Sequence, residues 1–196
     1  MDNIRILERS GKIWFSSVEI SSLLGLSFQA CAVFCSRAVS RGDLIRAKRG
    51  IFVLPRGFKT ASENEIFALS NILQTPSYIS LTSALSALGV STQIVRSACE
   101  AISPVRSSSY EIGGIMFTYA CFSRKLFCGF ERRDGVFMAT PEKAFADAAY
   151  LTSLGRYSLD LSALNLSLLK RDRIDYFLKK YTPRTRRYIE KIMGAE

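Results

Sequence analysis

The stretch from Ser16 to Gly42 most constrains what this chain can fold into, because it holds two short helical patterns separated by one tight turn. In the first pattern, SSVEISSLLG, Ser16 or Ser17 can cap a helix that ends at Gly25. The second pattern, FQACAVFCSRAVSRG, follows Ser27, which suits an N-cap, and ends at Gly42. Two helices joined by such a short glycine-containing turn predict a helix-turn-helix.

Helical periodicity predicts which residues of this region are buried. In the second helix the apolar residues that recur at helical spacing are Cys31, Phe34, Cys35 and Ala38. In the first helix we expect the inward-facing residues to be Val18, Leu23 and Leu24. A short helix and a strand-like IWF run precede them, with Ile4 and Leu7 facing inward and Gly11 ending that helix.

A cationic hairpin follows the two helices. Its strands are predicted at residues 43–48 and 51–54, and its tip carries Arg46, Lys48 and Arg49. A helix-turn-helix followed by a basic hairpin is typical of a winged helix. Because phosphate contacts hold a protein in register on DNA, we expect the hairpin tip to touch phosphate.

The exposed face of the second helix is expected to enter the major groove at its N-terminal end. Gln29 suits adenine, Val33 suits the methyl group of thymine, and Arg37 suits guanine or phosphate. Large polar residues are few on this face, so DNA shape and wing contacts are expected to contribute more than direct base contacts. The candidate DNA-binding residues, including Ser27 at the helix N-terminus, are Ser27, Gln29, Val33, Ser36, Arg37, Arg46, Lys48 and Arg49.

The charge of the chain indicates an anionic partner. The 196 residues carry a net charge of +10, which favours nucleic acid or an acidic protein. Residues 1–57 hold nine Lys or Arg against four Asp or Glu, and residues 170–191 hold nine against three. The second excess predicts another basic surface, formed by Lys170, Arg171, Arg173, Lys179, Lys180, Arg184, Arg186 and Arg187.

Several classes of enzyme are disfavoured by the residue types present. The sequence has no histidine, no CxxC pair and no phosphate-binding glycine loop, so the usual zinc sets and Ser–His or Cys–His pairs are missing. Cys31 and Cys35 are four residues apart and suit a soft metal, but reduced core thiols are favoured. We expect no catalytic residue, no metal site and no cofactor.

The rest of the chain alternates between helical and strand-like segments. PRGFKTAS at 55–62 is rich in turn residues and predicts a boundary between domains 1–58 and 59–196. Beyond it, helices are expected before Pro76 and at 78–89, strands within 94–138, a helix capped by Thr140, and two helices split by Pro183. No apolar run is long enough to span a bilayer, so a cytoplasmic protein with no membrane partner is expected.

Three motifs in order carry a resemblance to a known family. They are RGIFVLP at 49–55, the PSYIS…SAL…G segment at 76–89, taken as a helix, and the TPEKAFAD helix at 140–147. With a winged helix ahead of the last two, they resemble the AbiEi antitoxin family of type IV toxin–antitoxin systems. The resemblance implies an α+β protein with an N-terminal winged helix-turn-helix followed by a mixed α/β C-terminal antitoxin domain.

The family resemblance also implies partners. The winged helix would bind repeats in the promoter of its own operon as a cooperative repressor, and a basic C-terminal surface would add to DNA contact. The C-terminal domain would counter a nucleotidyltransferase-like toxin without a stable complex. Pro141, Glu142 and Lys143 match the family motif and are interpreted as helix-start architecture. The alternatives are a stand-alone winged-helix regulator without a toxin and, least favoured, an enzyme acting on nucleic acid.

Overall fold

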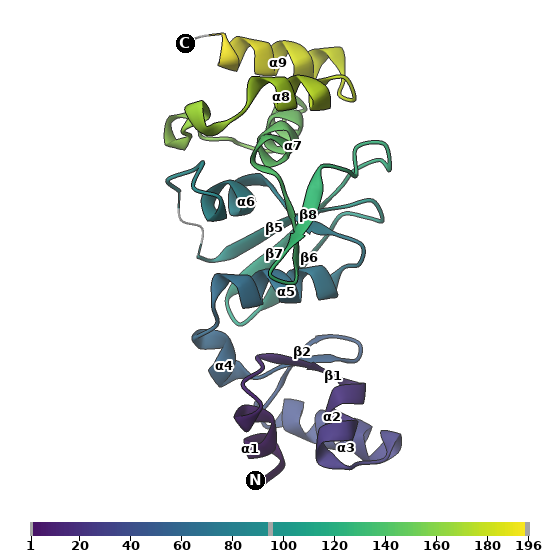
Figure 1. Cartoon of the computed structure of the whole chain (residues 1–196). Coiled ribbons are helices and arrows are strands. Elements are labelled where there is room, and N and C mark those ends of the chain that lie inside the picture. The colour runs from purple at the N-terminus through teal and green to yellow at the C-terminus, as the bar shows by residue number, and fades with distance from the viewer. Residues whose placement is uncertain (1, 94–95, 195–196) are drawn as a thin grey trace. The chain divides into compact units, whose positions relative to one another are not determined.

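The computed structural model of the chain describes residues 2–93 and 96–194 (Figure 1). Contacts divide the chain into two compact units. The first comprises Met1–Leu69 and Tyr110–Gly114, and the second comprises Ser70–Ser109 and Ile115–Glu196. Both contain helices and strands, so the predicted α+β class is confirmed.

The first unit contains a winged helix. The elements of this winged helix and the helix that follows it are α1 (Asp2–Arg9), β1 (Trp14–Ser16), α2 (Ser17–Leu24), α3 (Phe28–Ser40), β2 (Ile45–Lys48), β3 (Ile51–Val53) and α4 (Pro55–Lys59). The strands form one antiparallel sheet in the order β1-β3-β2. β1 therefore joins the wing hairpin as a third strand, which ties the start of the helix-turn-helix to the wing.

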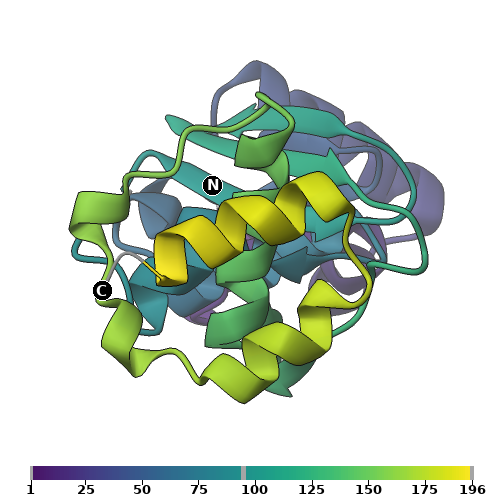
Figure 2. The same ribbon diagram turned by 90° about the horizontal axis from the view of Figure 1, so that it is seen from above.

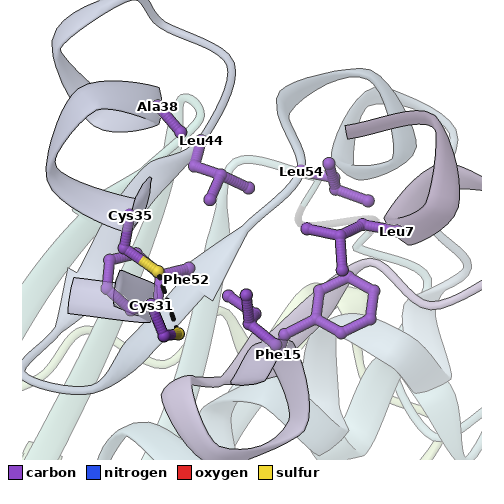
Figure 3. Packing of buried hydrophobic residues seen from close by; sticks show 9 residues of the cluster. Leu7, Phe15, Cys31, Cys35, Ala38, Leu44, Phe52 and Leu54 are labelled. Atoms are coloured by element: carbon purple, nitrogen blue, oxygen red, sulfur yellow. Dashed lines mark hydrogen bonds between the residues drawn. The ribbon is translucent and has the colours of Figure 1, made fainter. Parts of the chain in front are cut away.

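The helices and the sheet of this unit share one apolar core. Its fully enclosed residues come from α1, α2 and α3 and from the three strands or their ends: Leu7, Phe15, Ile20, Cys31, Cys35, Ala38, Leu44, Phe52 and Leu54. Figure 3 shows Cys31 and Cys35 of α3 next to each other and close to Phe52 of the wing, with a sulfur–sulfur distance of 3.9 Å. The predicted core residues Ile4, Leu24 and Phe34 are half-buried and pack against this cluster.

The turn-rich segment at 55–62 contains a helix that the sequence did not predict. Pro55 begins α4, and α5 (Glu63–Leu73) follows after a short link. Proline is tolerated at the first helical position because that amide has no intrahelical partner. The proposed boundary between domains 1–58 and 59–196 stays a prediction.

The second unit is built on a mixed sheet. The strands of this sheet are β4 (Tyr78–Ile79), β5 (Ala98–Ser103), β6 (Ser108–Ile112), β7 (Ile115–Cys121), β8 (Phe130–Arg133) and β9 (Val136–Ala139), in the order β6-β7-β5-β4-β9-β8. Residues 110–112 of β6 are grouped with the first unit. Strands thus occur within 94–138 as expected, although residues 94–95 lie outside the described part. The motif at 76–89 is not one helix: β4 occupies its start, and α6 (Leu81–Ala87) begins only after Ser80.

Helices cover this sheet in the order that the sequence predicted. α7 (Pro141–Ser153) begins at Thr140, whose hydroxyl oxygen accepts a hydrogen bond from the Lys143 amide. Two single 3-10 turns, Leu161–Ala163 and Leu166–Leu168, lead to α8 (Arg171–Leu178) and α9 (Pro183–Met193). Figure 2 shows α8 and α9 lying over α7, and Pro183 begins α9, as expected for the break between the two pieces.

A buried ion pair lies at the centre of the second unit. Lys143 Nζ donates to Asp147 Oδ1 at 2.5 Å and to the Leu126 carbonyl at 2.9 Å. The other Asp147 oxygen accepts hydrogen bonds from Tyr78 and Ser80, each at 2.9 Å. Burial raises the pKa of Tyr78, and the Asp147 carboxylate raises it further, so the phenol stays a donor. The network joins α7, β4 and the start of α6 with its charged groups fully enclosed.

We expect Asp147→Ala to destabilise the protein strongly. The change leaves Lys143 as an uncompensated buried charge, which lowers the free energy of unfolding by about 3–5 kcal/mol. Chemical denaturation of the full chain measures this change. The matched control is Asp175→Ala, which breaks the exposed i,i+4 pair with Arg171 at 3.4 Å and should cost less than about 1 kcal/mol. Equal effects of the two substitutions would contradict the expected role of the buried pair.

Candidate nucleic-acid interface

Local capping sets the geometry of α2 and α3. Ser16 forms a capping box with Glu19: its hydroxyl oxygen accepts from the Glu19 amide at 3.2 Å, and the Glu19 carboxylate accepts from the Ser16 amide at 2.8 Å. Gly25 ends α2 with φ +62, a backbone conformation that favours glycine. Ser27 then caps α3 by accepting from the Ala30 amide. Ser16 is therefore the N-cap, which resolves the alternative left open by the sequence.

The two helices cross at the angle expected of a helix-turn-helix. Their axes are bent by 106°, within the range of about 90–120° that is typical of the motif. No single helix in the described parts of the chain is long and apolar enough to cross a membrane, and α2 and α3 meet that length and composition only together, as this bent pair.

The predicted division of α3 into two faces is confirmed. Cys31, Cys35 and Ala38 are buried, and Phe34 is half-buried. The five candidate DNA-binding residues on or just before α3 are all exposed: Ser27, Gln29, Val33, Ser36 and Arg37. The structure thus brings them together on the outer surface of one helix.

The predicted inward face of α2 is partly wrong. Val18 is 70% exposed and Leu23 is 46% exposed, whereas Ile20 is fully buried. Leu24 packs against the core, as expected. Only one narrow side of α2, marked by Ile20 and Leu24, faces the core. The spacing of Ile20 and Leu24, one helical turn apart, was the signal that identifies that side.

The wing presents its cationic residues beside α3. Arg46 and Arg49 are exposed and Lys48 is half-exposed. Arg49 and Gly50 form the turn between β2 and β3, and Gly50 has φ +77. The carbonyl of Gly50 accepts a hydrogen bond from the Ser17 amide at 2.8 Å. The tip of the wing is therefore anchored on the first turn of α2, which fixes the arginines relative to the helix-turn-helix.

A shallow groove of about 530 Å³ lies between α3 and the wing. Phe28, Ala32 and Cys35 line it from α3, while Arg46, Arg49 and Phe52 line it from the wing. The Arg46 guanidinium lies 5.7 Å from the centre of the Phe52 ring, close enough for a cation–π contact that holds it along the groove. Phe28 was missed by the sequence analysis because it directly follows the N-cap, where no preceding turn of helix covers its side chain.

The charge of this surface is almost entirely positive. Between residues 20 and 62 the chain has seven Lys or Arg and one acidic residue, Asp43, which pairs with Arg41 at 2.8 Å. The Glu19 carboxylate forms an ion pair with Lys12 and accepts a hydrogen bond from the Ser16 hydroxyl. Burial would raise the pKa of Glu19, but Lys12 and Ser16 outweigh it and lower that pKa below its usual value. No acidic side chain within α3 or the wing opposes an anion.

Cys31 and Cys35 belong to the core of the winged helix. Both are buried, and Cys31 Sγ donates to the Ser17 carbonyl at 3.3 Å. Burial and the neighbouring Cys31 raise the pKa of the Cys35 thiol to about 12. Both thiols lie within the apolar core, which agrees with the interpretation of the pair as reduced core thiols.

The second basic surface is less available than its charge suggests. Four of its cations already have partners: Arg171 pairs with Asp175, and Lys180 donates to Cys128 at 3.2 Å. Arg186 donates to the Leu178 and Lys179 carbonyls, and Arg187 donates to the Pro183 carbonyl at 3.5 Å. The other predicted members are exposed on α8 and α9 or directly beside α8: Lys170, Arg173, Lys179 and Arg184. Any role of these residues in binding stays a prediction.

The capped helix pair, the three-stranded sheet and the basic wing define the class of this unit: a winged helix-turn-helix of the kind that nucleic-acid-binding regulators use. Residues 3–55 match the family of transcriptional regulators described as AbiEi antitoxin. The match confirms the suspected family resemblance, and it spans the winged helix alone. No curated protein matches the chain.

We expect thiol labelling to separate the core cysteines from the surface one. Cys121 is exposed, whereas Cys31 and Cys35 are enclosed and the pKa of Cys35 lies far above neutral pH. At pH 8 a soluble alkylating reagent should therefore modify Cys121 first in the native protein and all five thiols in denaturant. Peptide mass spectrometry over time gives the order. Rapid native modification of Cys31 or Cys35 would show that the winged-helix core opens readily.

Proposed function

We propose that this protein is a DNA-binding antitoxin and the transcriptional autorepressor of a type IV toxin–antitoxin operon. In this proposal residues 1–58 bind repeats in the promoter of its own operon, in the cytoplasm. Residues 59–196 form the antitoxin domain, which counters a nucleotidyltransferase-like toxin. The protein acts by binding and carries no catalytic role.

One observation supports the DNA-binding part above all others. The exposed side of α3 and the wing form a continuous surface without an acidic residue, and the capped N-terminus of α3 lies within it. Duplex DNA carries about one charge per 1.7 Å of helix axis, so such a surface suits its backbone. In this arrangement α3 lies in the major groove, with Gln29, Val33 and Arg37 toward base edges and Arg46, Lys48 and Arg49 toward phosphates.

The antitoxin part rests on the family description and on the motifs of the second unit. Lys143 of the TPEKAFAD motif is a buried structural residue, paired with Asp147, which agrees with interpreting that motif as architecture. The second basic surface on α8 and α9 would add contacts to DNA through its exposed members. Contact with the toxin need not be stable in this proposal.

A stand-alone winged-helix regulator is the second candidate. It is favoured by the extent of the family match, which covers residues 3–55 only. The two candidates share the DNA-binding surface and differ in the gene beside this one. A neighbouring frame that resembles a nucleotidyltransferase supports the antitoxin, and its absence supports the regulator.

We expect promoter binding by the full chain to depend strongly on salt and on the wing. The triple substitution Arg46→Ala, Lys48→Ala and Arg49→Ala should weaken binding to promoter and scrambled duplexes by similar factors, because backbone phosphates are the same in both. Each lost phosphate contact should reduce the slope of log K against log salt by about 1. Fluorescence anisotropy at several salt concentrations measures both quantities.

A matched control removes the same charges elsewhere. Arg106, Arg124 and Lys125 are exposed residues of the second unit, outside α8 and α9, and replacing them with alanine should leave the salt slope unchanged. Gln29→Ala or Arg37→Ala should instead reduce the preference for the promoter duplex by about 1–3 kcal/mol. Loss of promoter binding with unchanged scrambled-duplex binding in the wing variant would reverse this assignment.

The wing variant should also separate repression from antitoxicity. Expressed from an independent promoter together with the neighbouring toxin gene, both the wild-type chain and the wing triple variant should restore growth. Only the wild type should repress a reporter fused to the operon promoter. Failure of the wing variant to restore growth, at matched protein level, would place antitoxicity on the DNA-binding surface.

A further inference from the structure

The first turns of α3 expose apolar side chains where a DNA-binding helix usually carries polar ones. Phe28 is 72% exposed and Val33 is 50% exposed, and Ala32 lies exposed between them. Exposed large apolar residues gathered on one helix of a small unit indicate a contact surface, since single scattered ones would need no explanation. The core cluster contains Cys31, Cys35 and Ala38 from α3, and none of these three exposed residues belongs to it.

Hydrogen-bonding capacity is scarce in the same turns. From Phe28 to Val33, Gln29 is the only residue of the exposed face with a polar side chain. In the major groove each base pair shows donors and acceptors, and thymine alone of the four bases adds a methyl group. An apolar side chain distinguishes base pairs there only through that methyl group. Gln29 suits adenine, the partner of thymine, through two hydrogen bonds.

The surroundings of these residues favour DNA over a protein partner. Phe28 and Ala32 line the groove whose opposite side carries Arg46 and Arg49, and no acidic residue lies on α3 or the wing. The cation–π contact with Phe52 holds the Arg46 guanidinium beside the apolar residues that line this groove. A phosphate backbone seated against the two arginines would bring the adjacent base edges toward the start of α3.

We propose that α3 recognises A·T base pairs through their thymine methyl groups, which contact Phe28, Ala32 and Val33 while Gln29 bonds adenine. The proposal rests on the proposed binding of duplex DNA and names the bases that this surface selects. It gives the apolar residues of the recognition helix a positive role in specificity. A preference for T arises from burial of its methyl group, so it does not depend on an ion pair or on a narrow minor groove.

Four synthetic 24-bp duplexes test this proposal with the full-length protein. One contains only A·T pairs in mixed order, and the second replaces every thymine with uracil, which removes the methyl group and leaves the hydrogen-bond pattern intact. The third contains only G·C pairs in mixed order, and the fourth replaces every cytosine with 5-methylcytosine, which places a methyl group in the major groove. We expect the wild type to lose about tenfold in affinity from thymine to uracil, for about two buried methyl groups, and to gain affinity from cytosine to 5-methylcytosine.

Two variants and a matched control assign the effect to α3. Phe28→Ala and Val33→Ala should each reduce the ratio of thymine-duplex to uracil-duplex affinity while leaving uracil-duplex affinity nearly unchanged. The control is Val105→Ala, because Val105 is 59% exposed and lies in the second unit, between β5 and β6; it should leave every ratio unchanged. All three positions are exposed, and equal melting temperatures verify that the variants fold.

The results of these measurements distinguish failure of this inference from failure of the proposed function. Equal affinity for thymine and uracil duplexes, with salt-dependent binding retained, overturns the methyl contact and leaves DNA binding intact. Absence of binding to every duplex overturns both. If Phe28→Ala changes the oligomeric state in size-exclusion chromatography but no duplex affinity, the apolar surface contacts protein and the inference is wrong.

Discussion

Burial of one side of α3 against the three-stranded sheet is the contact on which the exposed surface of α3 and the wing depends. Cys31 and Cys35 have small side chains, so α3 lies close to Phe52 of the wing and to the start of α2. Because a helix has a fixed period, burying these two residues and Ala38 determines which residues point outward. The groove beside Phe28, the exposure of Val33 and the position of Arg46 all follow from that contact.

The turns of the first unit define how α2, α3 and the wing are positioned relative to one another. The Ser16 capping box, Gly25 and Ser27 end one helix and begin the next within a few residues. The hydrogen bond from the Ser17 amide to the Gly50 carbonyl then ties the wing to the same helix pair. A surface that is already ordered before binding loses less conformational entropy when it binds, which suits the DNA-binding role proposed for α3 and the wing.

The second unit differs from the first in that it encloses an ion pair, Lys143 with Asp147, in its interior. Lys143 and Asp147 are one helical turn apart and are both enclosed, with aromatic rings of Tyr78, Phe122, Phe177 and Tyr181 around the ammonium group. A buried ion pair is a weak source of stability compared with apolar packing, yet removing one partner is costly. Such a pair disfavours packings of α7 in which either charge is left without its partner.

The sequence alone determined the elements whose signals are local. The serine caps, Gly25, Thr140 and Pro183 set helix ends through the backbone and side-chain groups of a few neighbouring residues, and the spacing of Cys31, Cys35 and Ala38 fixed the buried side of α3. The i,i+4 spacing of Lys143 and Asp147 can be read from the sequence, but their burial cannot, because it depends on strands and helices that are distant in the chain. It placed Val18 and Leu23 inside because hydrophobicity was the only guide, whereas the tertiary structure buries Ile20 and leaves those two exposed. The groove beside Phe28 forms only where α3 and the wing pack side by side, and the residue pattern of neither element by itself predicts it.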